Sequence, residues 1–280
     1  MQELNSNIIN NNSFSPIEKD SLFIIKIGGN IIDDEVKLSF FLNKFAHIKG
    51  KKILVHGGGK LATKLAAQLG VEQQMVEGRR ITDAETLKIV TMVYAGYINK
   101  NIVAKLQSYS CNAIGLSGAD GNTISAHKRP LKNGIDYGFV GDVDTVNTQL
   151  LENLLDQHLT VVLAPITQDL KGQLLNTNAD TIAQETAKAL SFNYNVQLIY
   201  SFEKSGVLLN AADDTSVISS INTESYQDLK QKQVIFAGMI PKLDNAFAAI
   251  QAGVKRVIIG KAEELDLLIS GNSGTSIVHD

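Results

Sequence analysis

Lys51-Lys52-Ile53-Leu54-Val55-His56-Gly57-Gly58-Gly59-Lys60 is the stretch that decides the fold of this 280-residue chain. Its apolar run has no polar interruption, as expected of a strand that is covered on both faces of a sheet. Similar runs recur along the chain, and amphipathic stretches separate most of them. This alternation predicts an α/β fold with a mainly parallel sheet. The expected strands are residues 22–27, 52–56, 112–116, 160–164, 196–201 and 256–259.

A long helix is expected between residues 83 and 108, with Thr82 as its N-cap. Its apolar residues cover more of the helix surface than one-sided burial requires. Two explanations remain open: a central core helix, or a helix that also packs on a second subunit. Later helices are expected to begin near Asn178, Thr223 and Pro241.

Composition narrows the class of partner. The formal net charge of −3 gives no electrostatic reason to expect a nucleic acid. No apolar run approaches the eighteen or so residues that a membrane span needs, so no membrane partner is expected either. Cys111 is the single cysteine, which excludes an internal disulfide, and the first residues lack the pattern of a secretory signal. We therefore expect a cytoplasmic protein with small-molecule ligands.

The chain divides into three parts by composition and motif placement. Residues 1–20 are rich in Asn and Ser and are expected to form a flexible tail. A boundary between two halves, 21–166 and 167–280, is expected after the strand that ends near Ala164. No linker rich in Pro, Gly or Ser marks this boundary.

Two glycine loops follow apolar strands. The first is Lys26-Ile27-Gly28-Gly29-Asn30 and the second is His56-Gly57-Gly58-Gly59-Lys60. Glycines at such junctions let backbone N–H groups approach an anion, and the helix dipole adds to the attraction. Neither loop is a Walker A motif or a Rossmann fingerprint. His56 is expected to end its strand and help position the loop rather than bind a metal.

Two arginines occupy the segment Gly78-Arg79-Arg80-Ile81-Thr82. A guanidinium near a glycine loop suits bidentate recognition of a carboxylate. Adjacent arginines are more often both solvated, but only one of the two has to point inward.

Polar groups also gather at two later helix starts. In Asn176-Thr177-Asn178-Ala179-Asp180, Asn178 is expected to be an N-cap and Asp180 to lie in the first helical turn. In Gly238-Met239-Ile240-Pro241-Lys242, the proline puts Lys242 in the first turn of a helix. A cation is electrostatically misplaced there, so Lys242 is a candidate for holding an anion.

The motifs KIGGN, HGGG, GRRIT, GLSGADGN, GFVGDV, NTNAD, SGVL, GMIPK and GTSI occur in this order between residues 22 and 278. As an ordered set they resemble the N-acetyl-L-glutamate kinases of the amino-acid kinase superfamily. Carbamate, aspartate and uridylate kinases share the first glycine loop, but GRRIT and NTNAD resemble the N-acetylglutamate branch in particular.

This resemblance implies an open α/β/α sandwich whose N-terminal half binds the acyl amino acid and whose C-terminal half binds ATP. The implied reaction is phosphorylation of a γ-carboxylate in arginine biosynthesis. Because that carboxylate is already ionised at neutral pH, no general base is needed. Mg²⁺ is expected to enter with ATP, without a dedicated metal site in the protein. A homodimer is expected.

The resemblance also implies residue roles. Lys26 and Lys242 would bracket the moving phosphoryl group, with Asp180 holding both lysines. Phosphate contacts would come from Lys26, Lys242, Gly28, Gly29 and Gly58; the amino acid would be bound by Gly58, Gly59, Arg80 and Asn176; the nucleotide would lie near Glu203, Gly206 and Gly238. Glu203 stands where the family usually has an aspartate, which leaves the nucleotide contacts of residues 202–204 open.

Two alternatives accompany this interpretation. The first is the same chemistry on N-succinyl-L-glutamate, because none of these motifs contacts the acyl end. The second is a non-catalytic amino-acid sensor of the same fold, which loss of a charged group at the phosphoryl position would favour. Both lysines and Asp180 are present, which favours an enzyme.

Overall fold

The computed structural model describes residues 19–76, 79–131, 133–210, 212–232, 234–235 and 239–279. The predicted flexible tail lies outside these ranges, apart from its last two residues. The division into halves at residue 166 remains a prediction.

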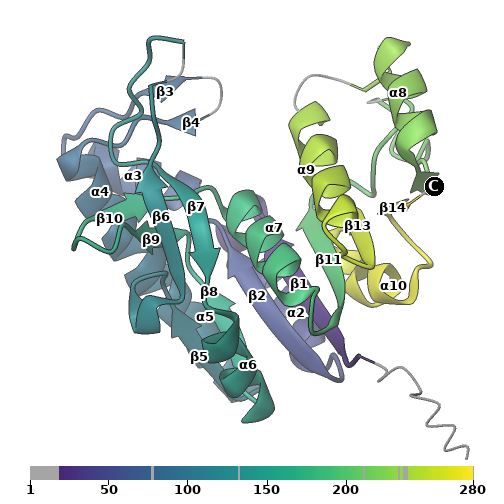
Figure 1. The fold of residues 1–280 in the computed structure, drawn as a ribbon, viewed down its shortest axis with the longest axis horizontal. Coiled ribbons are helices and arrows are strands. Elements are labelled where there is room, and N and C mark those ends of the chain that lie inside the picture. The colour runs from purple at the N-terminus through teal and green to yellow at the C-terminus, as the bar shows by residue number, and fades with distance from the viewer. Residues whose placement is uncertain are drawn as a thin grey trace, which may run out of the picture.

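A central sheet organises the described residues (Figure 1). It has eight strands in the order β12-β14-β13-β11-β1-β2-β8-β5. The strands are β1 Ser21–Ile27, β2 Lys51–His56, β5 Ala113–Leu116, β8 Thr160–Leu163, β11 Asn195–Phe202, β12 Ser220–Ile221, β13 Arg256–Lys261 and β14 Thr275–Ile277. Every pairing is parallel except that of β13 with β14. The α/β prediction and all six predicted strands are confirmed.

Smaller sheets flank the N-terminal half. Four short strands pair in the order β10-β9-β6-β7, and β3 pairs with β4. Their bounds are β3 Met75–Val76, β4 Arg79–Arg80, β6 Ile124–Lys128, β7 Gly141–Val146, β9 Ile166–Gln168 and β10 Leu174–Asn176. The apolar pattern of the sequence predicted none of these strands.

Helices connect the strands and cover the sheet. The α-helices are α1 Gly29–Ile32, α2 Glu35–Ala46, α3 Gly59–Gln68, α4 Ala84–Thr91, α5 Asn99–Ser108, α6 Thr148–Asp156, α7 Ala179–Leu190, α8 Thr223–Gln231, α9 Ile240–Gln251 and α10 Leu265–Ser270. A π-helix, η1, spans Met92–Ile98, and two 3₁₀ turns are η2 Asp120–Asn122 and η3 Ala262–Glu264.

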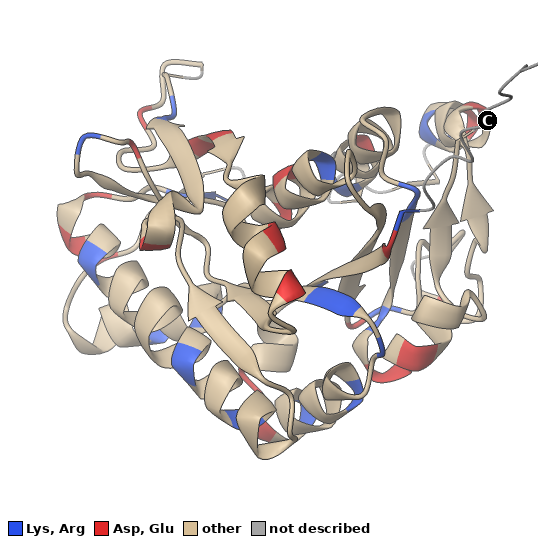
Figure 2. Cartoon of the chain, turned by 60° about the horizontal axis from the view of Figure 1, so that its bottom comes forward, with Lys and Arg blue, Asp and Glu red and all other residues tan. Residues whose placement is uncertain are grey.

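Two hydrophobic clusters lie on opposite faces of the sheet. Successive residues of β1 show the division: Ile24 belongs to one cluster with residues of α6, α7, α8 and α9, while Ile25 belongs to the other with residues of α2, α4 and α5. Both isoleucines are fully buried. Charged residues are spread over the surrounding helices, and the central strands carry few of them (Figure 2). The fold is therefore an α/β/α sandwich.

The long helix between residues 83 and 108 differs from its prediction in two ways. Asp83, not Thr82, is the N-cap, because the Asp83 carboxylate accepts the N–H of Thr86 at 2.7 Å. The helix also changes to π-geometry at Met92–Ile98 before it resumes as α5. The predicted later helices are confirmed: Asn178 caps α7, and α8 and α9 begin at Thr223 and Ile240.

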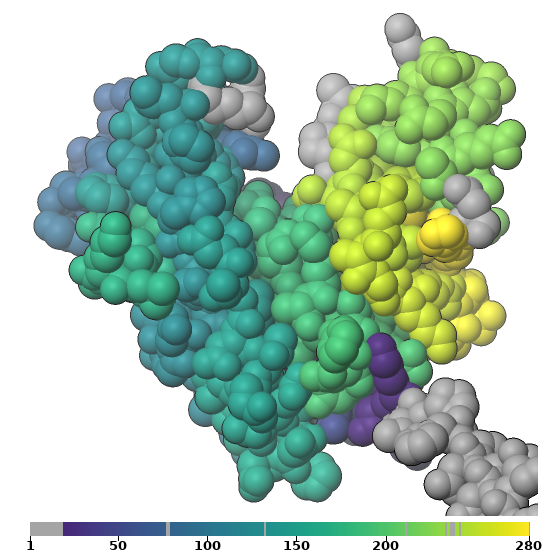
Figure 3. All heavy atoms as spheres, in the orientation of Figure 1, coloured from purple at the N-terminus to yellow at the C-terminus, as the bar shows by residue number. Residues whose placement is uncertain are grey.

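The molecule is hollowed between its N-terminal part and its C-terminal part, with α7 at the base of the hollow (Figure 3). The carboxyl ends of β1, β2 and β11 open toward this region. In open α/β sheets, ligands bind at this edge of the strands.

Candidate active site

The two glycine loops lie side by side. β1 and β2 are parallel neighbours in which Ile27 pairs with His56, so both loops begin at the same level of the sheet. The N–H of Gly57 donates to the carbonyl of Ile27 at 3.3 Å and joins the loops directly. Each loop leads into a helix, α1 or α3, and glycines at both helix starts, Gly29, Gly58 and Gly59, line one cavity.

Lys26, Asp180 and Lys242 form a contiguous charged group. Lys26 Nζ lies 2.8 Å from Asp180 Oδ1, and Lys242 Nζ lies 3.2 Å from Asp180 Oδ2. The lysines come from β1 and from the first turn of α9, whereas the aspartate lies in the first turn of α7. One carboxylate therefore separates two ammonium groups from distant parts of the chain.

The protonation state of Asp180 follows from its surroundings. Burial alone would raise the pKa of this carboxyl, whose side chain is 19% exposed. The charges and hydrogen bonds of Lys26 and Lys242 outweigh burial and hold the pKa at about 2. Asp180 is therefore ionised at neutral pH, and the three residues together carry one net positive charge.

Arg80 is buried in β4 and directed toward the second glycine loop. One terminal nitrogen, Nη2, donates to the Gly59 carbonyl and to the Thr63 hydroxyl, each at 2.9 Å. The other, Nη1, donates to the Gln73 side chain. The Tyr94 hydroxyl is a further partner of this guanidinium. Arg79, in contrast, is exposed. Both arginines line the cavity described below, but only Arg80 is buried.

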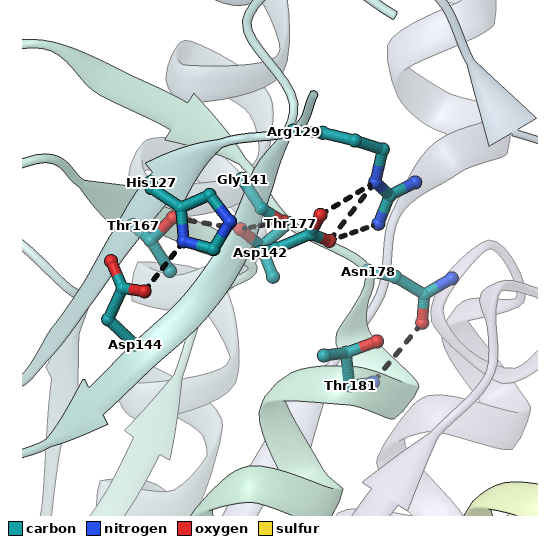
Figure 4. Close-up of polar contacts among 9 residues, drawn as sticks. All are labelled: His127, Arg129, Gly141, Asp142, Asp144, Thr167, Thr177, Asn178 and Thr181. Atoms are coloured by element: carbon teal, nitrogen blue, oxygen red, sulfur yellow. Dashed lines mark hydrogen bonds and ion pairs between the residues drawn. The ribbon is translucent and has the colours of Figure 1, made fainter. Parts of the chain in front are cut away.

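Asn176 and Asn178 have different surroundings. Asn176, at the end of β10, donates from Nδ2 to the Thr82 hydroxyl at 3.0 Å. Asn178 caps α7 by accepting the N–H groups of Asp180 and Thr181, and Figure 4 shows the contact with Thr181. The N-cap prediction for Asn178 is confirmed.

A cavity of about 270 Å³ brings most of these groups together. Of the residues singled out from the sequence for roles in the site, it is lined by Lys26, Gly29, Gly58, Gly59, Arg80, Asn176 and Asp180. Gly28 and Lys242 do not line it, although Lys242 contacts Asp180 at its edge. The wall carries several cationic groups and, among the described lining residues, a single carboxylate. Such a cavity is suited to an anionic ligand.

The described residues that are expected to contact a nucleotide, Glu203 and Gly206, do not line this cavity. Glu203 and Gly206 lie after the end of β11, and Gly238 lies outside the described residues. Gly206 is packed closely: a Cβ there would lie 2.7 Å from Thr275 Oγ1 and 2.8 Å from Val217 Cγ1. Close packing therefore accounts for this glycine, and a nucleotide contact remains a prediction.

Sequence reasoning missed two residues that line the cavity. Arg129, just after β6, forms a bidentate pair with Asp142 of β7, in which Nε lies 3.0 Å from Oδ1 (Figure 4). Tyr94 reaches the cavity from the π-helix, and its pKa is raised by burial despite the nearby Arg80. The GFVGDV motif, which includes Asp142, gave a signal for the first pair, but no local pattern identified Tyr94.

Within the described residues, no three His, Cys, Asp or Glu side chains gather as a metal site would require. In the same part of the chain, no helix combines the length and apolar character needed to cross a bilayer.

Comparison with known proteins fits this geometry. The model of the amino acid kinase family matches residues 21–261. The chain belongs to the amino acid kinase family. Relatives of similar length include an acetylglutamate kinase from Cytophaga hutchinsonii, 61% identical over 92% of this chain and 98% of that protein. Another, from Parabacteroides distasonis, is 56% identical over 88% of this chain and 96% of that protein. The resemblance to the acetylglutamate kinase branch of the family is confirmed.

Solved structures agree on the amino acid kinase fold. An N-acetylglutamate synthase from Neisseria gonorrhoeae matches 94% of this chain with a TM-score of 0.80 and 21% identity. This chain spans only 60% of that synthase. A carbamate kinase from Giardia matches 94% of this chain and all of its own, with a TM-score of 0.70 and 15% identity. At these identities the likeness concerns the fold alone.

Proposed function

We propose that this protein transfers the γ-phosphoryl group of ATP to the γ-carboxylate of N-acetyl-L-glutamate and forms an acyl phosphate. The observation that carries the proposal is the Lys26–Asp180–Lys242 group beside two glycine loops. The reaction joins two anions, so its main requirement is positive charge held where the phosphoryl group moves. Relatives named acetylglutamate kinase support the substrate.

Each residue then has a role. Lys26 and Lys242 stabilise the charge of the phosphoryl group during transfer, and Asp180 keeps the two lysines close despite their mutual repulsion. Phosphoryl and carboxylate oxygens accept hydrogen bonds from the backbone N–H groups of Gly28, Gly29, Gly58 and Gly59. These four glycines therefore act only through their backbone N–H groups.

The α-carboxylate of the amino acid is proposed to bind Arg80, whose guanidinium lines the cavity next to Tyr94. Asn176 is proposed to contact the same substrate from the end of β10. Because Thr82 accepts one hydrogen of the Asn176 amide, the orientation of this amide is already set before the substrate binds.

ATP is proposed to bind on the C-terminal side, near Glu203, Gly206 and Gly238, with Mg²⁺ on its phosphate oxygens. Asp180 is the single carboxylate among the described residues that line the cavity, and lysines contact both of its oxygens. This arrangement supports a metal that the phosphates and water hold, where it neutralises charge.

The protein is also proposed to be a homodimer in the cytoplasm. Met92 and Tyr97 of the π-helix are 56% and 66% exposed, and beside them α3 and η1 line a cavity of about 420 Å³. Exposed apolar groups that gather in this way are typical of a contact between subunits. A single cysteine and an ATP-dependent reaction fit a reducing, ATP-containing compartment.

The test is formation of the acyl phosphate, trapped as a hydroxamate with hydroxylamine. N-Acetyl-, N-succinyl- and unmodified L-glutamate are compared at equal concentration with ATP and Mg²⁺. We expect the N-acetyl compound to have the highest kcat/KM. A higher value for the N-succinyl compound would make N-succinyl-L-glutamate the substrate of the same reaction. Absence of hydroxamate with all three compounds would favour a non-catalytic sensor.

A further inference from the structure

A buried chain of hydrogen bonds lies behind the second glycine loop. His56, fully buried at the end of β2, approaches the carbonyl of its neighbour Gly57 with Nδ1 at 2.8 Å. Its other nitrogen, Nε2, lies 3.2 Å from Nδ2 of Asn99. Because an amide nitrogen only donates, Nε2 must be the acceptor and Nδ1 must carry the proton. Asn99 therefore stabilises the tautomer in which His56 donates to the loop.

The imidazole remains neutral in this position. Burial lowers the pKa of His56 to about 4, the bond to Gly57 opposes this effect, and the nearby Lys100 adds to it. Asn99 is also fully buried, and its Nδ2 donates in addition to the Val162 carbonyl at 3.0 Å. Lys100 donates to Asn99 Oδ1 at 3.1 Å and fixes which end of the amide faces the histidine.

The π-helix brings Asn99 to this place. In an α-helix, residues five apart lie about 140° apart around the axis. In η1, the N–H of Asn99 donates to the Tyr94 carbonyl, a bond between residues five apart that widens the turn. Tyr94 and Asn99 consequently reach the same side of the helix. Such π-segments are frequent at functional sites.

Two close contacts show how little freedom this region has. Gly58 has φ +152°, and a Cβ there would lie 2.3 Å from Ile98 Cδ1, so the loop is pressed against the π-helix. On the other side, a Cβ on Gly115 would lie 1.9 Å from Asn99 Oδ1. The amide is thus held between β5 and the imidazole.

We propose that Asn99 is a positioning residue for the phosphoryl transfer. Through His56 it fixes the carbonyl of Gly57, whose N–H is bonded to Ile27 at the end of β1, and so sets the distance between the two glycine loops. The N–H groups of Gly58 and Gly59 act only at the correct distance from Lys26. This inference rests on the proposed function, but the ¹⁵N signals of His56 test it without turnover.

The first experiment compares Asn99→Leu with Ile102→Val, a buried change in α5 at an apolar side chain that makes no hydrogen bond to His56 or to the loop. In Asn99→Leu, His56 Nε2 loses its donor while Nδ1 still faces the Gly57 carbonyl, so the Nδ1–H tautomer remains and the ¹⁵N signal of Nε2 moves to that of a nitrogen without a hydrogen bond. We expect kcat to fall at least about tenfold while KM for ATP stays within about twofold. Ile102→Val should melt lower with unchanged kcat and an unchanged Nε2 signal.

Asn99→Asp is the second variant because it keeps the size of the side chain if Asn99→Leu fails to fold. A carboxylate accepts from Nε2, so His56 can hold Gly57 only as the doubly protonated imidazolium, beside Lys100. The kcat of this variant should fall as pH rises through the pKa of His56, whereas wild-type kcat lacks this step. Wild-type kcat, or an unchanged Nε2 signal, in the Asn99 variants that fold would overturn the proposal. Absence of acyl phosphate formation by the wild type would instead overturn the proposed function.

Discussion

Asp180 is the residue with the most demanding electrostatic position in the site. Its carboxylate contacts two lysines, lies in the first turn of α7 and remains ionised with a pKa of about 2. An acid in the first turn of a helix contributes about 0.3 to 1 kcal/mol through the helix dipole alone. Asp180 also holds two ammonium groups together, and loss of this second contribution should lower kcat as well as stability.

Asp180→Asn separates these two contributions. Without the negative charge, Lys26 and Lys242 repel each other, and small displacements in a mechanism based on positioning cost about a hundredfold in rate. We expect kcat to fall by at least that factor while KM for the acyl amino acid changes little. Steady-state kinetics of Glu185→Gln, an ion-paired acid of the same helix, provide the control. Near wild-type turnover with a lower Tm would show that Asp180 is only a helix-terminal acid.

Arg80→Lys tests recognition of the α-carboxylate. A lysine replaces the planar fork with a point charge and loses the bonds to Gly59, Thr63 and Gln73. Losing one charge-assisted bond costs roughly 1.5 to 3 kcal/mol, so KM for the amino acid should rise by about tenfold or more, with a smaller change in kcat. Arg79→Lys, at the exposed neighbour, is the matched variant. Equal effects of the two changes would assign the role elsewhere.

At the scale of elements, strand positions were more predictable than caps and helix geometry. The six apolar runs correspond to six strands of the central sheet, because burial on both faces requires continuous apolar sequence. The strands of the second sheet are short and partly polar, so they lack this signal. Thr82 and Asp83 are both residue types that cap helices, so the sequence does not distinguish them. In the folded chain, it is the Asp83 carboxylate that reaches the N–H of Thr86.

The π-helix could not be predicted, because a widened turn leaves the apolar composition of the segment unchanged.

The residues of the site likewise divide into those that the sequence could predict and those that it could not. Lys26, Asp180 and Lys242 were proposed together and lie together, since each stands beside a recognisable strand end or helix start. Arg129 and Tyr94 reach the cavity from a hairpin and from the π-helix, where sequence spacing carries no information about direction.

Asp83→Ala tests the cap of α4. Loss of the bond to Thr86 should lower the free energy of unfolding by about 0.5 to 2 kcal/mol, measured by urea denaturation. Thr82→Val is the informative neighbour, because the Thr82 hydroxyl accepts from Asn176 and does not cap the helix. It should raise KM for the amino acid more than Asp83→Ala does. Unchanged stability of Asp83→Ala would contradict the assignment of the cap to Asp83.

At the scale of the whole molecule, two buried titratable groups make stability depend on pH. The pKa of His56 is about 4 in the folded state against about 6.5 unfolded, so below pH 6.5 the unfolded chain binds the proton more readily. Stability present above pH 6.5 is lost toward pH 4, by about 3 kcal/mol. For Asp180, with its pKa lowered to about 2, a further loss of about 2 kcal/mol follows below pH 4.

Urea unfolding between pH 7.5 and about 4.5 measures the first of these losses. His56→Asn removes the titrating group, so its stability should change less over this interval than that of the wild type, even if it is lower throughout. Exposed histidines such as His127 remain in both proteins and cancel in the comparison. Parallel curves for the two proteins would refute the assignment to His56.

Assembly is the other property of the whole molecule. Sedimentation velocity should give a dimer, and Tyr97→Glu should shift it toward the monomer by placing a charge in the apolar contact. Phe192→Glu is the control, since Phe192 is also exposed but follows α7 on the other side of the sheet. A dimer that persists in Tyr97→Glu and dissociates in Phe192→Glu would place the interface on that other side.

The shared carboxylate also has a mechanical consequence. Lys26 is fixed in the middle of the sheet, whereas Lys242 belongs to a helix that borders the hollow of Figure 3. Asp180 thus links β1 to α9 through its two ion pairs. The contact with Lys242 is the longer of the two, at 3.2 Å against 2.8 Å, and this lysine is the more exposed, at 32% against 14%. Of the two ion pairs of Asp180, the one to Lys242 is therefore the weaker, and any separation of α9 from β1 would break it before the pair between Lys26 and Asp180.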